Sequence, residues 1–252
     1  MVADDGGAAM SEAWRDLGTP RADGVLLIGD HASAAVPADI DLGIESALLT
    51  QHIAIDIGVA EVAALLVESG AVDAAILGGV SRLVVDCNRD EEAPGVIPIA
   101  SDGHAIPGNA LDHAGREARL TRIFRPYHDH IAAVIAGARP AMILSLHSFT
   151  PQLASDPEQQ RPWEVGVLYN ADDRLAGPAI AALEAEGLVV GDQQPYSGKL
   201  LNATMNRHAE ANAIPYVGIE MRQDLVNDTA GQARFAERLA RMVGKAALKL
   251  SA

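Results

Sequence analysis

The stretch AMILSLHSF (141–149) decides the fold of this chain. A strand with one wet face alternates apolar and polar residues, whereas a parallel strand covered on both faces is a nearly continuous aliphatic run. Residues 141–146 are of the second kind, and the run ends at His147 and Ser148. Ligands of parallel sheets bind at the carboxyl ends of the strands. Taken alone, His147 could equally be a packed or capping histidine, so the interpretation depends on the rest of the chain.

Patterns typical of strands and helices alternate on both sides of this stretch. We predict strands at 25–28, 74–77, 82–86, 163–169, 188–192 and 215–222, and helices at 46–69, 114–137, 173–186, 199–212 and 228–249. No change of composition marks a domain boundary. We therefore expect one three-layer α/β/α sandwich with a mostly parallel (mixed) sheet over residues 23–252, preceded by a mobile segment at 1–22. A long polar loop at 87–112 is of the kind that is usually functional or mobile.

Charge and composition exclude several classes of protein. The 252 residues are 49% hydrophobic and carry a net charge of −15, so no excess of lysine and arginine is present to neutralise nucleic-acid phosphates. No apolar stretch approaches the roughly 18 residues of a membrane span, and the N-terminus does not resemble a signal peptide. The single cysteine, Cys87, excludes an intrachain disulfide and a thiolate metal cluster. We expect a cytoplasmic protein that binds neither nucleic acid nor membrane.

Polar residues collect where the predicted strands end. Because the carboxyl ends of parallel strands meet at one rim of a sheet, we expect these side chains to lie close together. Zinc binds neutral imidazole and carboxylate, and a free carboxylate nearby can take a proton from water, so the set is typical of a zinc hydrolase. The structural alternative is helix capping by Asp and Asn and loop bracing by Arg. The residues are Asp30, His31, Asp86, Asn88, Arg89, His147, Ser148, Glu220 and Arg222.

Seven short motifs carry a resemblance to a known family. They are DHASAAVP (30–37), HIAIDIG (52–58), SRLVVDCNRD (81–90), RPYHDHI (125–131), LSLHSF (144–149), PYSG (195–198) and NRHAEANAIPYVGIEMRQDL (206–225). In this order they resemble the N-formylglutamate amidohydrolase family, which is related in fold to the zinc carboxypeptidases. The resemblance covers about residues 24–245. It implies a phosphorylase/hydrolase-like fold, hydrolysis of a linear amide, and a place in histidine degradation.

The resemblance also implies a metal site with one divalent ion, for which zinc is expected. His31 and His147 match the family's metal-binding histidines. The carboxypeptidases take a further ligand from an H-x-x-E pattern, which is broken here because position 34 is Ala34. Asp56 is the best substitute as third ligand. The rival ligands are His52, expected one helical turn before Asp56, and Asp30, next to His31.

Further roles follow from the same resemblance. Glu220 resembles the carboxypeptidase-type general base, which would take a proton from water and pass it to the leaving nitrogen; the alternative is a Glu220–Arg222 brace. Arg82 is assigned to catalysis and, with other arginines, to carboxylate recognition, because a guanidinium meets a carboxylate with two parallel hydrogen bonds. The residues expected to bind substrate are Asn88, Arg89, Arg222, Ser148, Tyr196, Ser197 and His208.

The leading hypothesis is a zinc-dependent amidohydrolase that releases formate, or another small acyl group, from an acidic amino acid. Its expected partner is a small anionic N-acyl amino acid, and the sequence does not indicate the oligomeric state. A second hypothesis changes only the substrate, to another N-acyl amino acid or a C-terminal peptide bond. A third is a non-catalytic small-anion binding protein with structural histidines. A fourth uses Cys87 as a nucleophile, although a lone cysteine is more often a small buried hydrophobe.

Overall fold

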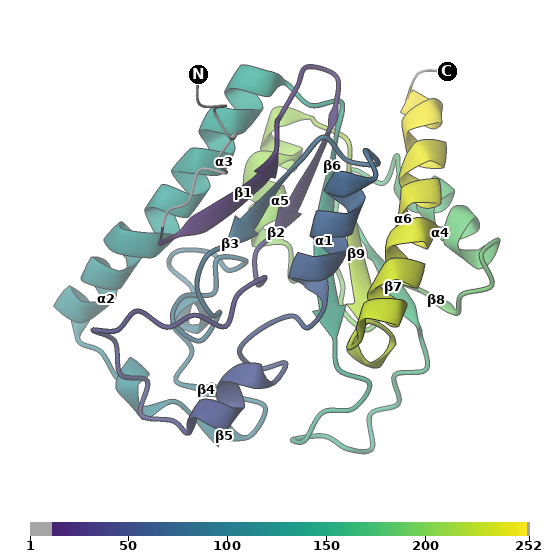
Figure 1. Cartoon of the computed structure of the whole chain (residues 1–252). Helices are drawn as coiled ribbons and strands as arrows, with labels where there is room; N and C mark the ends of the chain where they lie inside the picture. The colour runs from purple at the N-terminus through teal and green to yellow at the C-terminus, as the bar shows by residue number, and fades with distance from the viewer. Residues whose placement is uncertain (1–11, 251–252) are drawn as a thin grey trace, which may run out of the picture.

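A seven-stranded sheet forms the centre of the molecule in a computed structural model, which describes residues 12–250 (Figure 1). In spatial order its strands are β1 (Trp14–Gly18), β3 (Ala74–Gly78), β2 (Val25–Gly29), β6 (Met142–Phe149), β9 (Tyr216–Arg222), β7 (Val165–Leu168) and β8 (Val190–Asp192). The four strands β3, β2, β6 and β9 are parallel to one another, and β8 is parallel to β7. Within this sheet only the β1–β3 and β7–β9 pairs are antiparallel; β4 (Ala100–Ser101) and β5 (His104–Ala105) form a separate antiparallel pair. The predicted mostly parallel, mixed sheet is confirmed.

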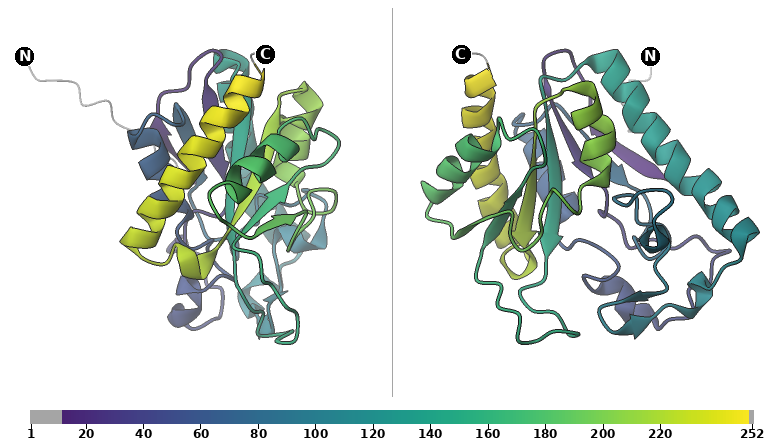
Figure 2. Two further views of the ribbon diagram at one scale, coloured as in Figure 1. Left: turned by 90° about the vertical axis from the view of Figure 1, so that its right-hand side faces the viewer. Right: turned by 180° about the vertical axis from the view of Figure 1, so that it is seen from behind.

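Helices cover both faces of the sheet, as Figure 2 shows from two sides. One face packs against α1 (Val59–Glu68), α4 (Ala176–Glu184) and α6 (Thr229–Leu250). The other face packs against α3 (Arg125–Ala138) and α5 (Ala203–His208), and α3 continues α2 (His113–Arg119) through a π-helical turn at Leu120–Phe124. The three-layer α/β/α arrangement is therefore confirmed, although α5 is shorter than the predicted helix at 199–212.

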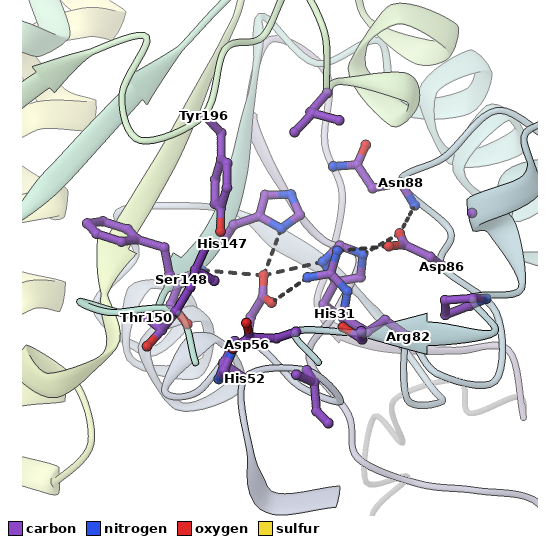
Figure 3. A pocket seen from close by; sticks show the side chains of 18 of the residues that line it. His31, His52, Asp56, Arg82, Asp86, Asn88, His147, Ser148, Thr150 and Tyr196 are labelled. Carbon is purple, nitrogen blue, oxygen red and sulfur yellow. Dashed lines mark hydrogen bonds and ion pairs between the residues drawn. The ribbon is translucent and has the colours of Figure 1, made fainter. Parts of the chain in front are cut away.

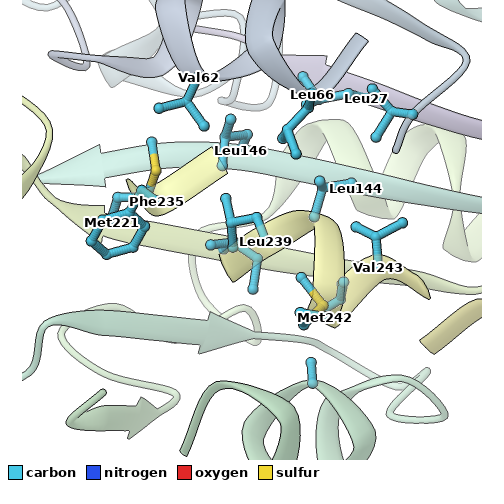
Figure 4. Close-up of a cluster of buried hydrophobic side chains, with 14 of the residues drawn as sticks. Leu27, Val62, Leu66, Leu144, Leu146, Met221, Phe235, Leu239, Met242 and Val243 are labelled. Atoms are coloured by element: carbon cyan, nitrogen blue, oxygen red, sulfur yellow. The ribbon is translucent and has the colours of Figure 1, made fainter. Parts of the chain in front are cut away.

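All eight residues of β6 are buried, which is the physical reason for its continuous apolar sequence. Successive side chains point to opposite faces of the sheet. Leu144 and Leu146 enter the cluster with α1 and α6 (Figure 4), whereas Ile143 enters the cluster with α3 on the other face. Because both sides of β6 are covered, only the carboxyl end of the strand is left for a polar site.

The core formed by α6 gives a first prediction. Leu239 is completely buried between α6 and the sheet, so Leu239→Ala removes buried methyl groups and leaves a cavity. We expect the free energy of unfolding to fall by about 2–5 kcal/mol in urea denaturation. Leu248 on the same helix is 72% exposed and provides the control, since Leu248→Ala should change stability by less than about 0.5 kcal/mol. Equal effects of the two substitutions would contradict this description of the core.

The predicted helix at 46–69 is wrong in its first half. A 3-10 turn at Ser46–Thr50 and helix α1 are separated by a non-helical turn at 51–58. Gly58 ends this turn with a φ of +82°, and a Cβ atom there would meet the carbonyl oxygen of Val226 at 2.5 Å. The glycine therefore lets the chain bend sharply before α1 begins, where the sequence periodicity predicts an unbroken helix.

The predicted strand at 82–86 is also wrong, because this run is a turn that joins no sheet. Leu83, Val84 and Val85 are fully buried in the cluster on the α3 side of the sheet. The carbonyl of Ser81 accepts the backbone N–H of Val84 at 2.8 Å and closes the turn. These apolar residues are therefore buried by packing in the core and not by pairing with a neighbouring strand.

The expected mobile segment at 1–22 needs a correction as well. Within the described part, β1 is an ordered edge strand, paired antiparallel with β3 from Trp14 opposite Gly78 to Gly18 opposite Ala74. The short, polar sequence WRDLG has no apolar alternation, and none of its five residues is fully buried. Residues 1–11 lie outside the described residues. Between residues 12 and 250, no helix combines the length and the apolar composition needed to cross a bilayer.

Candidate metal centre and active site

Three central strands bring the candidate site together at their carboxyl ends. His31 follows β2 directly, while His147 lies on β6 and Glu220 on β9. His147 and Glu220 are opposite each other in the parallel β6–β9 register. Strand β6 continues to Phe149, so His147 lies inside the strand, two residues before its carboxyl end, and not beyond it. The expectation that strand ends would gather these polar groups is met by the geometry.

Asp56 reaches the same point from the turn before α1. Its backbone N–H donates to the carbonyl of His31 at 2.9 Å, which fixes the turn against the end of β2. The predicted helical spacing of His52 and Asp56 does not exist, because both lie in the non-helical turn at 51–58. This bend, made possible by Gly58, is what directs the Asp56 carboxylate between the two histidines.

Two imidazole nitrogens and one carboxylate oxygen converge (Figure 3). The Oδ2 atom of Asp56 lies 3.3 Å from Nδ1 of His31 and 2.9 Å from Nδ1 of His147. All three residues are buried, and among residues 12–250 they form the one group of histidine, cysteine and acidic side chains able to share a metal ion. The rivals lie elsewhere: Asp30 faces the outer nitrogen of His147, and His52 bonds to Asp102.

Each histidine faces a second carboxylate with its outer nitrogen. Nε2 of His31 lies 2.7 Å from Oδ1 of Asp86, and Nε2 of His147 lies 3.4 Å from Oδ2 of Asp30. Metal-binding histidines commonly pair their other nitrogen with a carboxylate, which fixes the tautomer and the ring orientation. Asp86 is held in turn by Arg82 at 2.8 Å. This outer arrangement is the one expected around a metal-binding histidine pair.

The hydrogen-bonding capacity of the histidines shows that the residues fit a metal ion. A neutral imidazole has one N–H and one lone pair, and a carboxylate only accepts. If the outer nitrogens of His31 and His147 carry the protons, both Nδ1 atoms present lone pairs to the Oδ2 atom of Asp56. Three electron-pair donors then face one another, and a cation satisfies all three. Imidazole nitrogen and carboxylate oxygen are ligands that zinc accepts.

The charges of the cluster agree with this fit. Burial by itself raises the pKa of the Asp56 carboxyl, but the charge of His31 and hydrogen bonds from both histidines bring that pKa below its ordinary value. Burial lowers the pKa of His147, yet the Asp30 and Asp56 carboxylates raise it well above its ordinary value. The site therefore attracts positive charge, and protons and a metal ion compete for the same nitrogens.

Glu220 lies beside the cluster but is not one of the three residues whose ligand atoms converge. It is 7% exposed, and its Oε2 atom has no hydrogen-bond partner within the described residues. Burial raises the pKa of Glu220 to about 7. A carboxylate with a pKa near the working pH is well matched to general acid–base catalysis.

A pocket of about 420 Å³ opens onto this cluster. It contains nine of the predicted site residues, and Figure 3 shows the side chains of most of them pointing into it. The nine are His31, Asp56, Arg82, Asn88, Arg89, His147, Ser148, Tyr196 and Glu220.

Three predicted substrate-binding residues lie outside the lining of the pocket. Arg222 pairs with Asp224 at 2.8 Å instead of with Glu220, because β9 ends there and the chain turns. Ser197 accepts the backbone N–H of Lys199 in a turn. His208 is buried on α5, with its Nε2 atom 2.9 Å from Nδ1 of His128. These three assignments to substrate binding are not supported by the geometry.

Other residues at the site carry no assigned role in the sequence prediction. Asp86 ends the run at 82–86, and the sequence predicts no role for it beyond the rim of polar residues, yet its Oδ1 atom lies 2.7 Å from Nε2 of His31. Asp102 accepts from the backbone N–H groups of Ala154 and Ser155 and bonds to His52 at 2.9 Å, so it joins three loops at the pocket. No motif marks Asp102, and its position in a polar Asp-Gly turn gave no signal.

Comparisons with known proteins give consistent results. A family model described as N-formylglutamate amidohydrolase matches residues 23–227. The solved structure of gene product Atu2144 from Agrobacterium tumefaciens is 34% identical, with a TM-score of 0.88, and the match covers 96% of this chain and 97% of that one. N-formylglutamate amidohydrolase from Ralstonia eutropha JMP134 is 19% identical, with a TM-score of 0.70 and coverage of 96% and 99%. No curated protein sequence matches.

Proposed function

The chain belongs to the N-formylglutamate amidohydrolase family, and from this premise we propose that it is a zinc-dependent hydrolase of N-formyl acidic amino acids, producing formate and the free amino acid. The observation that carries the proposal is the convergence of His31, Asp56 and His147 beside the unpaired carboxylate of Glu220. Cytoplasmic location and a role in histidine degradation belong to the same proposal.

The cluster residues would hold one divalent ion. Such an ion polarises a carbonyl group and lowers the pKa of water. An ion pair from Nη1 of Arg82 to Oδ1 at 3.2 Å orients the Asp56 carboxylate, so that its Oδ2 atom faces Nδ1 of both histidines. Asp86, bonded to Nε2 of His31 at 2.7 Å, and Asp30, 3.4 Å from Nε2 of His147, would favour protons on these outer nitrogens.

Glu220 performs the proton transfers. Its carboxylate accepts a proton from the water that attacks the formyl carbon, and then donates that proton to the departing amide nitrogen. The oxygen that does this is the one without a hydrogen-bond partner in the described residues, Oε2. The single carboxylate thus returns to its starting state at the end of the cycle.

The polar end of the pocket near Asp86 supports binding of a substrate carboxylate. Arg82 pairs with Asp56 and Asp86, whereas Arg89 lies 3.7 Å from Asp86 and donates no hydrogen bond to a side chain or backbone carbonyl among residues 12–250. Asn88 accepts the backbone N–H of Thr204 with its Oδ1 atom at 3.1 Å, which leaves its amide nitrogen available as a donor. Arg89 and Asn88 would together hold one carboxylate.

This assignment predicts the effect of a charge-conserving substitution. Arg89→Lys keeps the positive charge but loses the planar fork, so we expect KM for an N-formyl acidic amino acid to rise about tenfold while kcat changes less. Steady-state kinetics of formate release would measure this. Arg174→Lys, in an exposed ion pair with Asp172, is the matched control. If the wild-type protein turns over the acid and its neutral amides at equal rates, Arg89 does not recognise a substrate carboxylate.

The competing hypotheses make different predictions. A non-catalytic anion-binding protein needs no metal, so metal analysis of the purified protein separates it from the proposal. A cysteine nucleophile has little support: Cys87 is 3% exposed, is not among the residues that line the pocket, and burial raises the pKa of its thiol well above the ordinary value. Which acyl group is removed depends on the contacts between that group and the side chains of the pocket.

A substrate panel tests the proposed function. Zinc-loaded protein is incubated with N-formyl, N-acetyl and N-succinyl derivatives of glutamate, aspartate, glutamine and alanine, and the release of formate and of free amino acid is measured. We expect N-formylglutamate or N-formylaspartate to be turned over most efficiently. Preference for an N-acetyl or N-succinyl derivative would support the second hypothesis, in which the site is the same but the acyl group differs.

A further inference from the structure

Arg161 is a buried arginine beside the pocket whose charge is not balanced by a carboxylate. The residue is 6% exposed, and no acidic side chain among residues 12–250 forms an ion pair with it. Its hydrogen bonds go to neutral acceptors: Nε donates to the side chain of Gln159 at 2.9 Å, and Nη1 donates to the carbonyl of Thr150 at 3.2 Å. A buried guanidinium in such surroundings retains most of its positive field, because nearby charges are screened little.

Tyr196 connects Arg161 to the pocket. Nη1 of Arg161 donates to the Tyr196 hydroxyl oxygen at 3.1 Å, and the guanidinium lies 5.2 Å from the centre of the tyrosine ring. Since the hydroxyl oxygen already accepts from Arg161, the hydroxyl proton is free to donate, and no described residue accepts it. Tyr196 lines the pocket and points into it in Figure 3. Thr150, whose carbonyl binds Arg161, lines the pocket beside it.

This donor lies on the other side of the metal cluster from Asn88 and Arg89. Tyr196 follows β8, at the β7–β8 side of the sheet, whereas Asn88 follows β3, and the strand order places β2, β6 and β9 between them. Figure 3 shows Tyr196 and Asn88 on opposite sides of the His31, Asp56 and His147 side chains. The pocket thus offers hydrogen-bond donors at two separate places, one at Asn88 and Arg89 and one at the Tyr196 hydroxyl in contact with Arg161.

We propose that Arg161 is a specificity-determining residue of this reaction: acting through the Tyr196 hydroxyl, it forms the subsite for one of the two carboxylates of the substrate. The inference rests on the proposed function for the identity of the reaction. Arg89 and Asn88 hold one carboxylate, and the Tyr196 hydroxyl donates to the other, with the charge of Arg161 behind it. Arg161 is a positioning residue, because it orients and polarises the group that touches the substrate.

The test compares substrates that differ only in charge. N-formylglutamate has two monoamides, one at the α-carboxyl group and one at the side chain, the latter being N-formylglutamine. For wild-type enzyme loaded with zinc we expect kcat/KM to be lower for both monoamides than for the diacid. Arg161→Gln should reduce the discrimination against one monoamide about tenfold or more and leave the discrimination against the other unchanged. Tyr196→Phe should act on the same monoamide, and Arg161→Lys should retain part of the discrimination.

A merely structural arginine would behave differently. Arg119 is the matched control, since it is buried, bonds to the carbonyl of Val84 and to Asn109, and forms no ion pair within the described residues. Arg119→Gln should leave both discrimination ratios unchanged even if stability falls. If Arg161→Gln lowers kcat/KM for the diacid and both monoamides by the same factor, the subsite does not exist.

A binding experiment separates this inference from the proposed function. Calorimetry with zinc-loaded protein compares L-glutamate with L-glutamine and with the α-amide of glutamate, and needs no turnover. We expect wild type to bind the dicarboxylate most tightly, and Arg161→Gln to lose that preference against one of the two amides. If Arg161→Gln loses this preference but the wild-type protein shows no deformylase activity, the subsite is supported and the proposed reaction is refuted. An unchanged preference in Arg161→Gln, or no preference in wild type, would overturn the subsite whatever the activity.

Discussion

Glu220→Gln is expected to lower kcat by roughly 10² to 10⁴ while zinc content and fold are retained, which is the usual contribution of general acid–base catalysis. Glutamine has the volume of glutamate and can still hydrogen-bond water, but it cannot accept a proton. Glu220 is buried with Oε2 unpaired among the described residues, and burial raises its pKa to about 7, so its loss removes the base and not a structural contact. The rate of formate release at saturating substrate would be measured together with the metal content per chain.

Glu210→Gln is the matched control for this variant. Glu210 is half-buried and accepts from the Tyr216 hydroxyl at 3.0 Å and from the backbone N–H of Asp172 at 3.0 Å, away from the pocket. It should change stability without changing kcat. If Glu220→Gln loses zinc, Glu220 is a ligand and the base is another residue. If it keeps nearly full activity, the general-base role is wrong.

His147→Ala is expected to abolish zinc binding and activity together. His147 supplies one of the three converging atoms, with its Nδ1 atom 2.9 Å from Oδ2 of Asp56. Removing even an outer partner of a metal ligand lowers metal affinity 10- to 100-fold, so removing the ligand itself should exceed about 100-fold. Zinc affinity by competition with a chromophoric chelator would show the loss, and circular dichroism would show that the fold persists.

The histidine control for this experiment is His208→Ala. His208 is equally buried, at 3% exposure, but it packs against His128 and is not among the pocket-lining residues. We expect this variant to lose stability and to keep its zinc affinity. Full zinc occupancy in His147→Ala would contradict the assignment of the metal centre. Zinc loss in His208→Ala at unchanged folding would extend the centre to α5.

The sequence predicts the centre of this fold better than its margins, for physical reasons. Strand β6 is buried on both faces, so its composition alone specifies a parallel strand and places His147 at a ligand-binding end. The run at 82–86 also contains consecutive aliphatic residues, Leu83 to Val85, but it packs without pairing, and composition does not separate these two uses. The break before α1 depends on one glycine in a left-handed conformation, which the apolar periodicity of 46–69 conceals.

The same distinction applies to the site. His31, His147 and Glu220 follow from strand ends, whereas Asp56 was selected by family resemblance, because its position depends on the bend at 51–58. Arg222 is predicted to bind substrate, with a brace to Glu220 as the alternative, but β9 ends at Arg222 and its side chain pairs with Asp224. Arg161 was missed because it lies in a polar loop without periodicity, and only the folded chain places it behind Tyr196.

The most direct test of the central claim measures formate release from N-formyl-L-glutamate by one protein preparation before chelation, after chelation and after zinc is restored. If His31, Asp56 and His147 hold a catalytic metal ion, the chelated protein should remain folded and release formate at least about 100-fold more slowly, and stoichiometric zinc should restore the original rate. An unchanged rate of formate release from folded, zinc-free protein would contradict the account.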